Sequence, residues 1–168
     1  MTEDTARLRR EIEEAFASTP YPGDAGLVMH NQGCRECAEV LEKYKGKHWR
    51  DYKDDPLSLV GPPYRYACMS FTPQAFRYYA PVALLAAAES YQEADVLTDY
   101  FLGTIVSPVG KYPAAERIAV FTPVELRALL SFLAFMREQH PLDYNEGPSR
   151  TDLAQLEDAI KARLDDRR

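Results

Sequence analysis

The chain has 168 residues, of which 46% are hydrophobic, 11% aromatic and 27% charged. This composition excludes an intrinsically disordered chain, and the length is typical of one domain, so we predict a single helical domain over residues 1–168. The formal net charge of −6 argues against nucleic acid as a partner, because nonspecific binding requires basic side chains that displace phosphate counterions.

The N-terminus and the cysteine content predict where the protein resides. The first residues, MTEDTARLRREIEE, lack the apolar run of a signal peptide, and no stretch approaches the roughly 20 apolar residues of a membrane span. Three cysteines cannot all pair with one another, which favours a reducing compartment. We therefore expect a cytoplasmic protein that does not bind membranes.

Apolar residues at helical spacing predict an all-α fold. Thr2 or Thr5 can cap the first helix, whose charged residues, Arg9 and Glu13 among them, are expected to face solvent. In chain order, the predicted helices span residues 4–18, 32–45, 73–90, 92–106, 123–139 and 151–166.

The helix over residues 73–90 is predicted to be the buried centre of the bundle. Thr72 is a good N-cap, and Pro73 suits the first helical position because its missing N–H has no helical partner there. Phe76 lies on its apolar face, and the second half of the helix is apolar all round. We therefore predict a bundle of about six helices around this segment.

A second helix start follows the same pattern. Thr122, with glutamate at position 125, forms a predicted capping box, and the helix that it opens is rich in leucine and phenylalanine. We expect this helix to pack against the central one and to place Leu130 in the shared core. Residues 64–71 alternate weakly and are predicted as extended loop, so the fold holds at most a minor strand.

The segment Cys34-Arg-Glu-Cys37 is the clearest chemical motif. Residues three apart on a helix face the same way, so two thiolates could hold one edge of a metal site. Cys68 and either His30 or His48 could complete a tetrahedral set of three cysteines and one histidine, with zinc as the expected ion. The set that we predict is Cys34, Cys37, Cys68 and His48.

The alternative for the same two cysteines is packing without metal. Cys34 and Cys37 share a predicted helix stripe with Ala38, Leu41 and Tyr44, and a free cysteine behaves as a small buried hydrophobe. Because a second C-x-x-C pair is absent from the sequence, we favour packing. A redox role requires the motif at a helix start that follows a strand; the helix start is present, but no strand is predicted before it.

Five residues near the central helix could line a binding pocket. The three polar side chains at positions 77–79 and the segment that carries the single tryptophan are the candidates. The alternative is that the aromatic residues are core residues with satisfied polar groups. The predicted binding residues are Trp49, Asp51, Arg77, Tyr78 and Tyr79.

The pattern T-P-x-A-F-R-Y-Y-x-P, which starts at Thr72, resembles a motif of a small bacterial domain family of unknown function. In that family a G-K-x-W segment and an A-F pair come earlier in the chain, as do the residues at 46–49 and 15–16 here. The resemblance spans about Ile12 to Met136. It implies a mostly helical fold, a bacterial source and no established activity.

The sequence leaves two classes of function open. It contains no nucleophile elbow, P-loop, dinucleotide fingerprint or H-E-x-x-H motif, so we favour a non-catalytic protein. The first class is a binding protein of the immunity or antitoxin type, which masks a partner protein with a basic surface and requires no cofactor. The second is a small zinc-structured domain or enzyme built on Cys34, Cys37 and Cys68.

Overall fold

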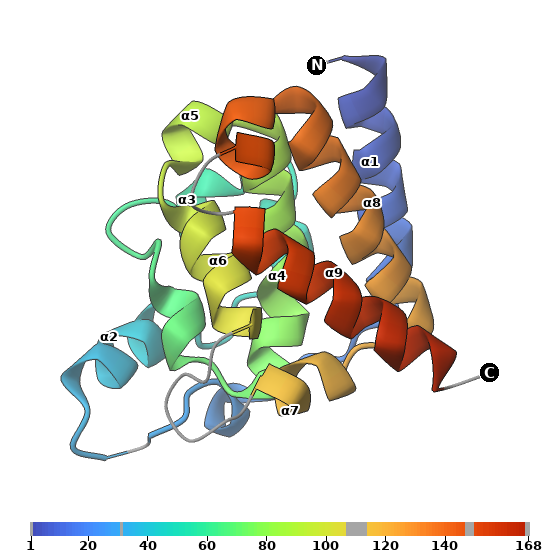
Figure 1. Cartoon of the computed structure of the whole chain (residues 1–168). Helices are drawn as coiled ribbons and strands as arrows, with labels where there is room; N and C mark the ends of the chain where they lie inside the picture. Colours follow the sequence, from blue (N-terminus) through green and yellow to red (C-terminus); the bar gives the residue numbers. More distant parts are fainter. Residues whose placement is uncertain (1, 31, 107–113, 147–149, 167–168) are drawn as a thin grey trace.

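The computed structural model describes residues 2–30, 32–106, 114–146 and 150–166 (Figure 1). Within these ranges the fold is all-α, as predicted, and the extended pairing is limited to one bridge between Val28 and Phe71. The helices are α1 (Glu3–Ala15), α2 (Arg35–Tyr44), α3 (Leu57–Val60), α4 (Pro73–Glu89), α5 (Tyr91–Ala94), α6 (Leu97–Val106), α7 (Ala114–Ala119), α8 (Pro123–Gln139) and α9 (Arg150–Asp165).

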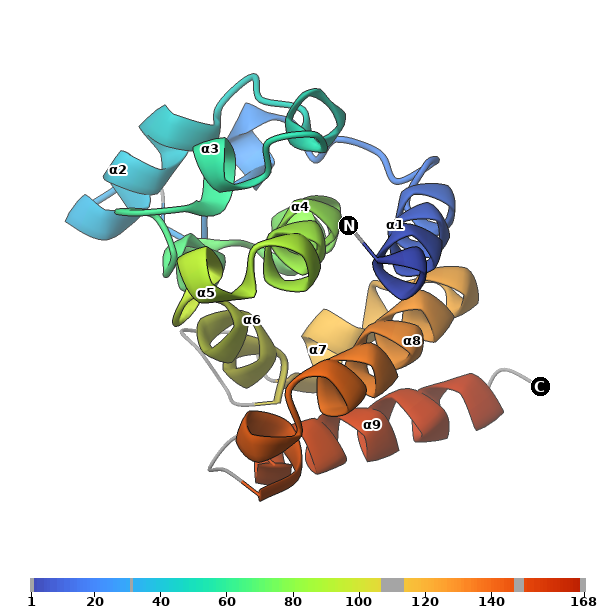
Figure 2. The ribbon, with the colours of Figure 1, turned by 90° about the horizontal axis from the view of Figure 1, so that it is seen from above.

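Helix α4 is the central element, as its composition predicts. It contacts α1, α6 and α8 and lies among them in the view along its axis, with α2 and α3 on the far side from α9 (Figure 2). The Thr72 hydroxyl accepts a hydrogen bond from the backbone N–H of Ala75 at 3.2 Å, which satisfies one of the unpaired donors of the first turn. The helix then continues through Pro81 with its second half buried.

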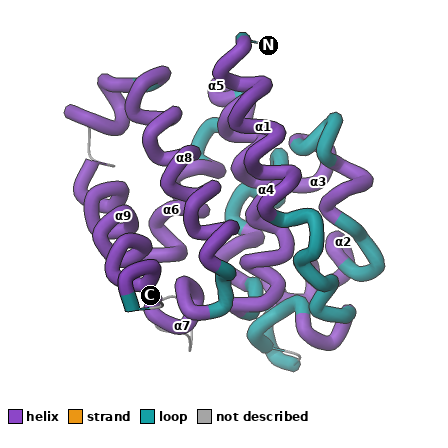
Figure 3. Tube along the Cα trace, turned by 90° about the vertical axis from the view of Figure 1, so that its right-hand side faces the viewer, coloured by secondary structure: helices purple, strands orange, loops and turns teal. Residues whose placement is uncertain are grey.

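Helix α8 forms the second half of the core and runs beside α1 and α9 (Figure 3). Its predicted capping box is present. The Glu125 backbone N–H donates to the Thr122 hydroxyl at 3.3 Å, and the Thr122 N–H donates to the Glu125 carboxylate at 2.7 Å. Three buried side chains of α9 seal the outer side of this layer: Leu153, Leu156 and Ile160.

The predicted helix set differs from the structure in several places, and α1 ends at Ala15 instead of residue 18. The helix predicted over residues 92–106 is divided into α5 and α6, because Asp95 has a φ of +50° that interrupts the helical backbone. Its carboxylate lies 3.2 Å from the Arg65 guanidinium, which helps to hold this break. The short helices α3 and α7 were not predicted, since four and six residues are too few for a periodic pattern.

Leu130 was predicted to lie in the shared core, but it lies at the edge of the core. Its side chain is only partly buried, whereas its neighbour Leu129 is buried. The core-facing stripe of α8 includes Leu126, Leu129 and Leu133, so Leu130 lies at the edge of this stripe.

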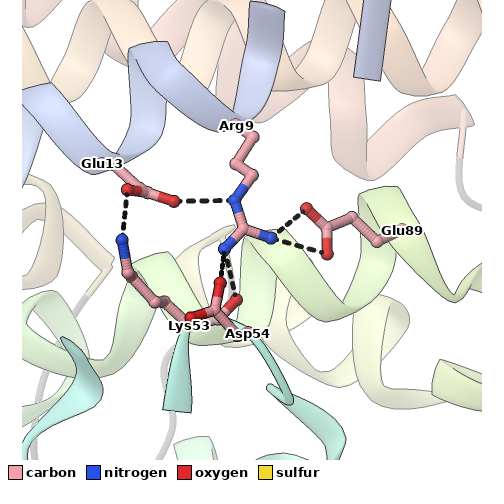
Figure 4. Close-up of polar contacts among 5 residues, drawn as sticks. All are labelled: Arg9, Glu13, Lys53, Asp54 and Glu89. Atoms are coloured by element: carbon pink, nitrogen blue, oxygen red, sulfur yellow. Dashed lines mark hydrogen bonds and ion pairs between the residues drawn. The ribbon is translucent and has the colours of Figure 1, made fainter. Parts of the chain in front are cut away.

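Arg9 is the centre of a polar network that joins three segments (Figure 4). Its Nε donates to Glu13 at 2.7 Å, and its Nη1 donates to both Glu89 oxygens at 2.9 and 3.2 Å. Its Nη2 donates to the Lys53 carbonyl oxygen at 3.0 Å and to the Asp54 carboxylate. The sequence pattern predicted that Arg9 faces solvent. Instead, Arg9 fastens α1 to the end of α4 and to the turn at Lys53 and Asp54, which lies between α2 and α3.

We expect Arg9→Ala to lower the free energy of unfolding by about 2–3 kcal/mol. The substitution leaves the Glu89 carboxylate without its cation, while Glu13 keeps only Lys53 at 3.0 Å, and hydrogen bonds to charged groups contribute more than neutral ones. Arg35→Ala is the matched control, because Arg35 also pairs with a glutamate four residues on, yet its side chain is 86% exposed. That loss should be about 0–0.5 kcal/mol. Equal losses in urea denaturation would show that the Arg9 network is fully screened by solvent.

Candidate metal site

Three potential metal ligands converge at the start of α2. One donor atom from each of His30, Cys34 and Cys37 lies within 4.8 Å of the other two. The Cys37 Sγ is 3.5 Å from the His30 Nδ1. The described residues contain this one group of three or more metal-ligating side chains, and it could hold a metal ion.

The local fold explains why His30 lies beside the cysteines. The Met29 N–H donates to the Ser70 carbonyl oxygen at 2.9 Å, and the Thr72 N–H donates to the Leu27 carbonyl oxygen at 3.0 Å. These two bonds fix the segment before His30 against the start of α4. Gly33, with a φ of +75°, then supplies the left-handed backbone that turns the chain into α2.

Cys34 is the N-cap of α2 and not a member of its packing stripe. Its backbone is extended, with a φ of −119°, and its Sγ accepts a hydrogen bond from the Cys37 N–H at 3.3 Å. Cys37 and Tyr44 are buried on the stripe as predicted, but Ala38 is exposed. The helix begins three residues later than predicted, and its predicted start at residue 32 is loop. Packing on the stripe therefore accounts for Cys37, whereas Cys34 packs against the core only partly buried, from the cap position.

Burial differs sharply across the three donors. Cys37 is 2% exposed, Cys34 is half-buried and His30 is exposed, so the group opens onto the surface from a buried base. Burial raises the pKa of the Cys37 thiol, and the adjacent Cys34 sulfur adds to the shift. Hydrogen bonds from the His30 backbone and from Ser70 oppose it and would support a thiolate on Cys37.

The other two predicted ligands lie elsewhere. The Cys68 thiol is buried and lies 3.7 Å from the Thr104 hydroxyl of α6, which is a packing position. The His48 Nδ1 is 3.0 Å from the Tyr78 hydroxyl. The structure thus brings Cys34 and Cys37 together but replaces Cys68 and His48 by His30. The signal for His30 was its position only four residues before Cys34, within one short segment.

The five predicted binding residues lie in different surroundings. Trp49 is a buried core residue, and Asp51 is exposed on the adjacent turn. The Tyr79 hydroxyl donates to backbone carbonyl oxygens, and the Tyr78 hydroxyl is engaged by His48, so both tyrosines pack as the alternative interpretation expected. Arg77 forms an ion pair with a glutamate of α8 and lines a separate surface pocket.

Neither a family model nor a curated protein or solved structure matched this chain. In the described ranges, no helix has the length and apolar character needed to cross a membrane.

Proposed function

We propose that this protein binds one zinc ion through His30, Cys34 and Cys37 and leaves the fourth coordination position to an external ligand. The observation that carries the proposal is the convergence of three donor atoms within 4.8 Å. Catalytic and exchangeable zinc sites commonly have three protein ligands and one open position, whereas closed structural sites have four.

The choice of zinc follows from the donor atoms. Two thiolates and one imidazole suit zinc and other thiophilic ions, whereas magnesium and calcium prefer oxygen ligands. Bonds of about 2.3 Å to sulfur and about 2.0 Å to nitrogen place tetrahedral ligands about 3.5–3.8 Å apart. The Cys37–His30 separation of 3.5 Å already has this value, so little rearrangement is needed on that edge.

Binding would add a bond between two segments that already meet beside Ser70. His30 follows the backbone bridge to the start of α4, while the cysteines belong to the first turn of α2. A bound ion therefore connects the loop to α2 and adds its binding energy to the stability of this region. Because His30 is exposed, an external ligand can reach the ion from solvent.

Zinc titration of the reduced, metal-free protein tests the proposal. We expect one equivalent to bind and the melting temperature to rise, and a chelator should reverse the rise. If about 10–16 kcal/mol of binding energy is shared among four ligands, removal of one ligand costs about 2.5–4 kcal/mol, which is about 60- to 700-fold in affinity. His30→Ala, Cys34→Ser and Cys37→Ser should each show this loss.

The controls are His48 and Cys68, which belong to the predicted ligand set but lie outside the group of three donors. His48→Ala matches His30→Ala as the loss of an exposed histidine, and Cys68→Ala matches the loss of a buried thiol. Both controls should retain wild-type zinc affinity, even though Cys68→Ala lowers stability through lost packing. Absence of zinc binding by the wild type, or an equal loss of affinity in the controls, would contradict the proposed site.

A further inference from the structure

Cys34 and Cys37 also have the arrangement of an exchangeable dithiol. Both are free cysteines, and their sulfur atoms belong to the group whose donors lie within 4.8 Å of one another. Cys34 precedes the first helical residue, so its side chain can rotate towards Cys37 without unwinding α2. No strand precedes the pair within the described residues, but thiol–disulfide exchange depends on the access and separation of the two sulfur atoms and does not need one.

The two thiols differ in access, which gives each a distinct role. Cys34 is half-buried beside the exposed His30, whereas Cys37 is 2% exposed. A small disulfide in solution can therefore reach the Cys34 sulfur, but it cannot reach the Cys37 sulfur directly. Cys37 is in turn adjacent to any mixed disulfide that forms on Cys34. This asymmetry between an accessible and a resolving cysteine is typical of redox-sensing pairs.

We propose that Cys34 and Cys37 form a reversible disulfide by exchange with low-molecular-weight disulfides, and that this modification and metal binding exclude each other. The Cys34 thiolate attacks the disulfide RSSR, forms Cys34–S–SR and releases one RS⁻. The Cys37 thiolate then attacks the Cys34 sulfur, forms the Cys34–Cys37 bond and releases the second RS⁻. Two protein thiols lose two protons and two electrons, and one RSSR becomes two thiols.

Exclusion follows from the donor set and rests on the proposed function. A metal-bound thiolate donates its lone pair to the ion and is not free to attack. Once the disulfide has formed, neither sulfur remains a thiolate, and His30 alone cannot retain zinc. Oxidation would thus release the ion and remove the link that it makes between the loop before α2 and the helix, while Cys68 stays reduced in the core.

Incubation of the reduced full-length protein with glutathione disulfide tests the proposal. In metal-free protein we expect free thiols to fall from three to one, with a mass loss of about 2 Da, a Cys34–Cys37 cross-link in the peptide map and reversal by dithiothreitol. With free zinc at about ten times its Kd, the rate should fall about tenfold, because only the metal-free fraction reacts. Retention of all three thiols, or a stable adduct on Cys34, would overturn the proposal.

Single variants assign the two roles. Cys37→Ser should stop at a mixed disulfide between glutathione and Cys34, Cys34→Ser should not react in the same time, and Cys68→Ala should react at the wild-type rate. If a variant does not fold, the wild-type peptide map still decides which thiols react. A cross-link that forms although the protein never binds zinc would support the dithiol and overturn the proposed function. Zinc binding that leaves the reaction rate unchanged would overturn the exclusion.

Discussion

Replacement of Glu125 by alanine is expected to lower the free energy of unfolding by about 3–5 kcal/mol. The Glu125 carboxylate is 1% exposed and accepts hydrogen bonds from Thr19 at 2.5 Å, from Arg77 at 2.9 and 3.0 Å and from the Thr122 N–H at 2.7 Å. The substitution leaves the Arg77 cation without its buried partner and removes half of the capping box of α8.

Glu138→Ala is the matched control on the same helix, because Glu138 is exposed. Its effect on the unfolding free energy should stay within about 0.5 kcal/mol. Glu125→Gln should fall between the two, since the amide can still accept hydrogen bonds but carries no charge to pair with Arg77. Urea denaturation measures all three variants, and a loss below about 1 kcal/mol for Glu125→Ala would mean that Arg77 is fully solvated once unpaired.

Glu125 shows what local sequence signals could predict. Thr72 and Thr122 identify their helix starts because a cap, a proline and, at Thr122, a glutamate lie within four residues, and the structure confirms both starts. The same glutamate also pairs with Arg77, which lies 48 positions away. No local pattern contains that second partner, so the sequence predicted the cap but not the ion pair.

The candidate metal ligands show the same difference between local and long-range signals. Cys34 and Cys37 lie three residues apart and were found from their spacing, and His30 belongs to the same segment. Cys68 and His48 were added because a tetrahedral site needs more donors, but their positions depend on how α6 and α4 pack. Short-range geometry is encoded by spacing, whereas a ligand from a distant segment requires the tertiary fold.

The helical spacing of apolar residues could not predict that Cys34 is half-buried. A stripe argument assumes that every member is helical, but Gly33 turns the chain so that Cys34 becomes the cap.

The partner protein with a basic surface, expected from composition and from the lack of catalytic motifs, stays a prediction, as does the resemblance to a bacterial family. Composition constrains such a partner only through net charge, which many unrelated proteins share.

Phe76→Ala is the second large effect that we expect, with a loss of about 3–5 kcal/mol in the free energy of unfolding. Phe76 is 1% exposed on α4 and stacks on Phe101 of α6, with ring centroids 4.7 Å apart and an interplanar angle of 11°. It also meets Phe121, at the start of the α8 segment, edge to face at 6.4 Å. Phe121 in turn contacts Phe16 at the end of α1 at 6.2 Å.

Truncation of Phe76 therefore creates a cavity where α4, α6 and the α7–α8 connection meet. The aromatic contacts add about 0.5–1.5 kcal/mol beyond the buried area. Leu130→Ala is the control, because Leu130 is only partly buried and should cost about 1–2 kcal/mol. If the m-value of urea unfolding is unchanged in both variants, both losses of unfolding free energy arise in the native state. If Leu130→Ala lowered the free energy of unfolding as much as Phe76→Ala, Leu130 would belong to the core, contrary to its partial burial.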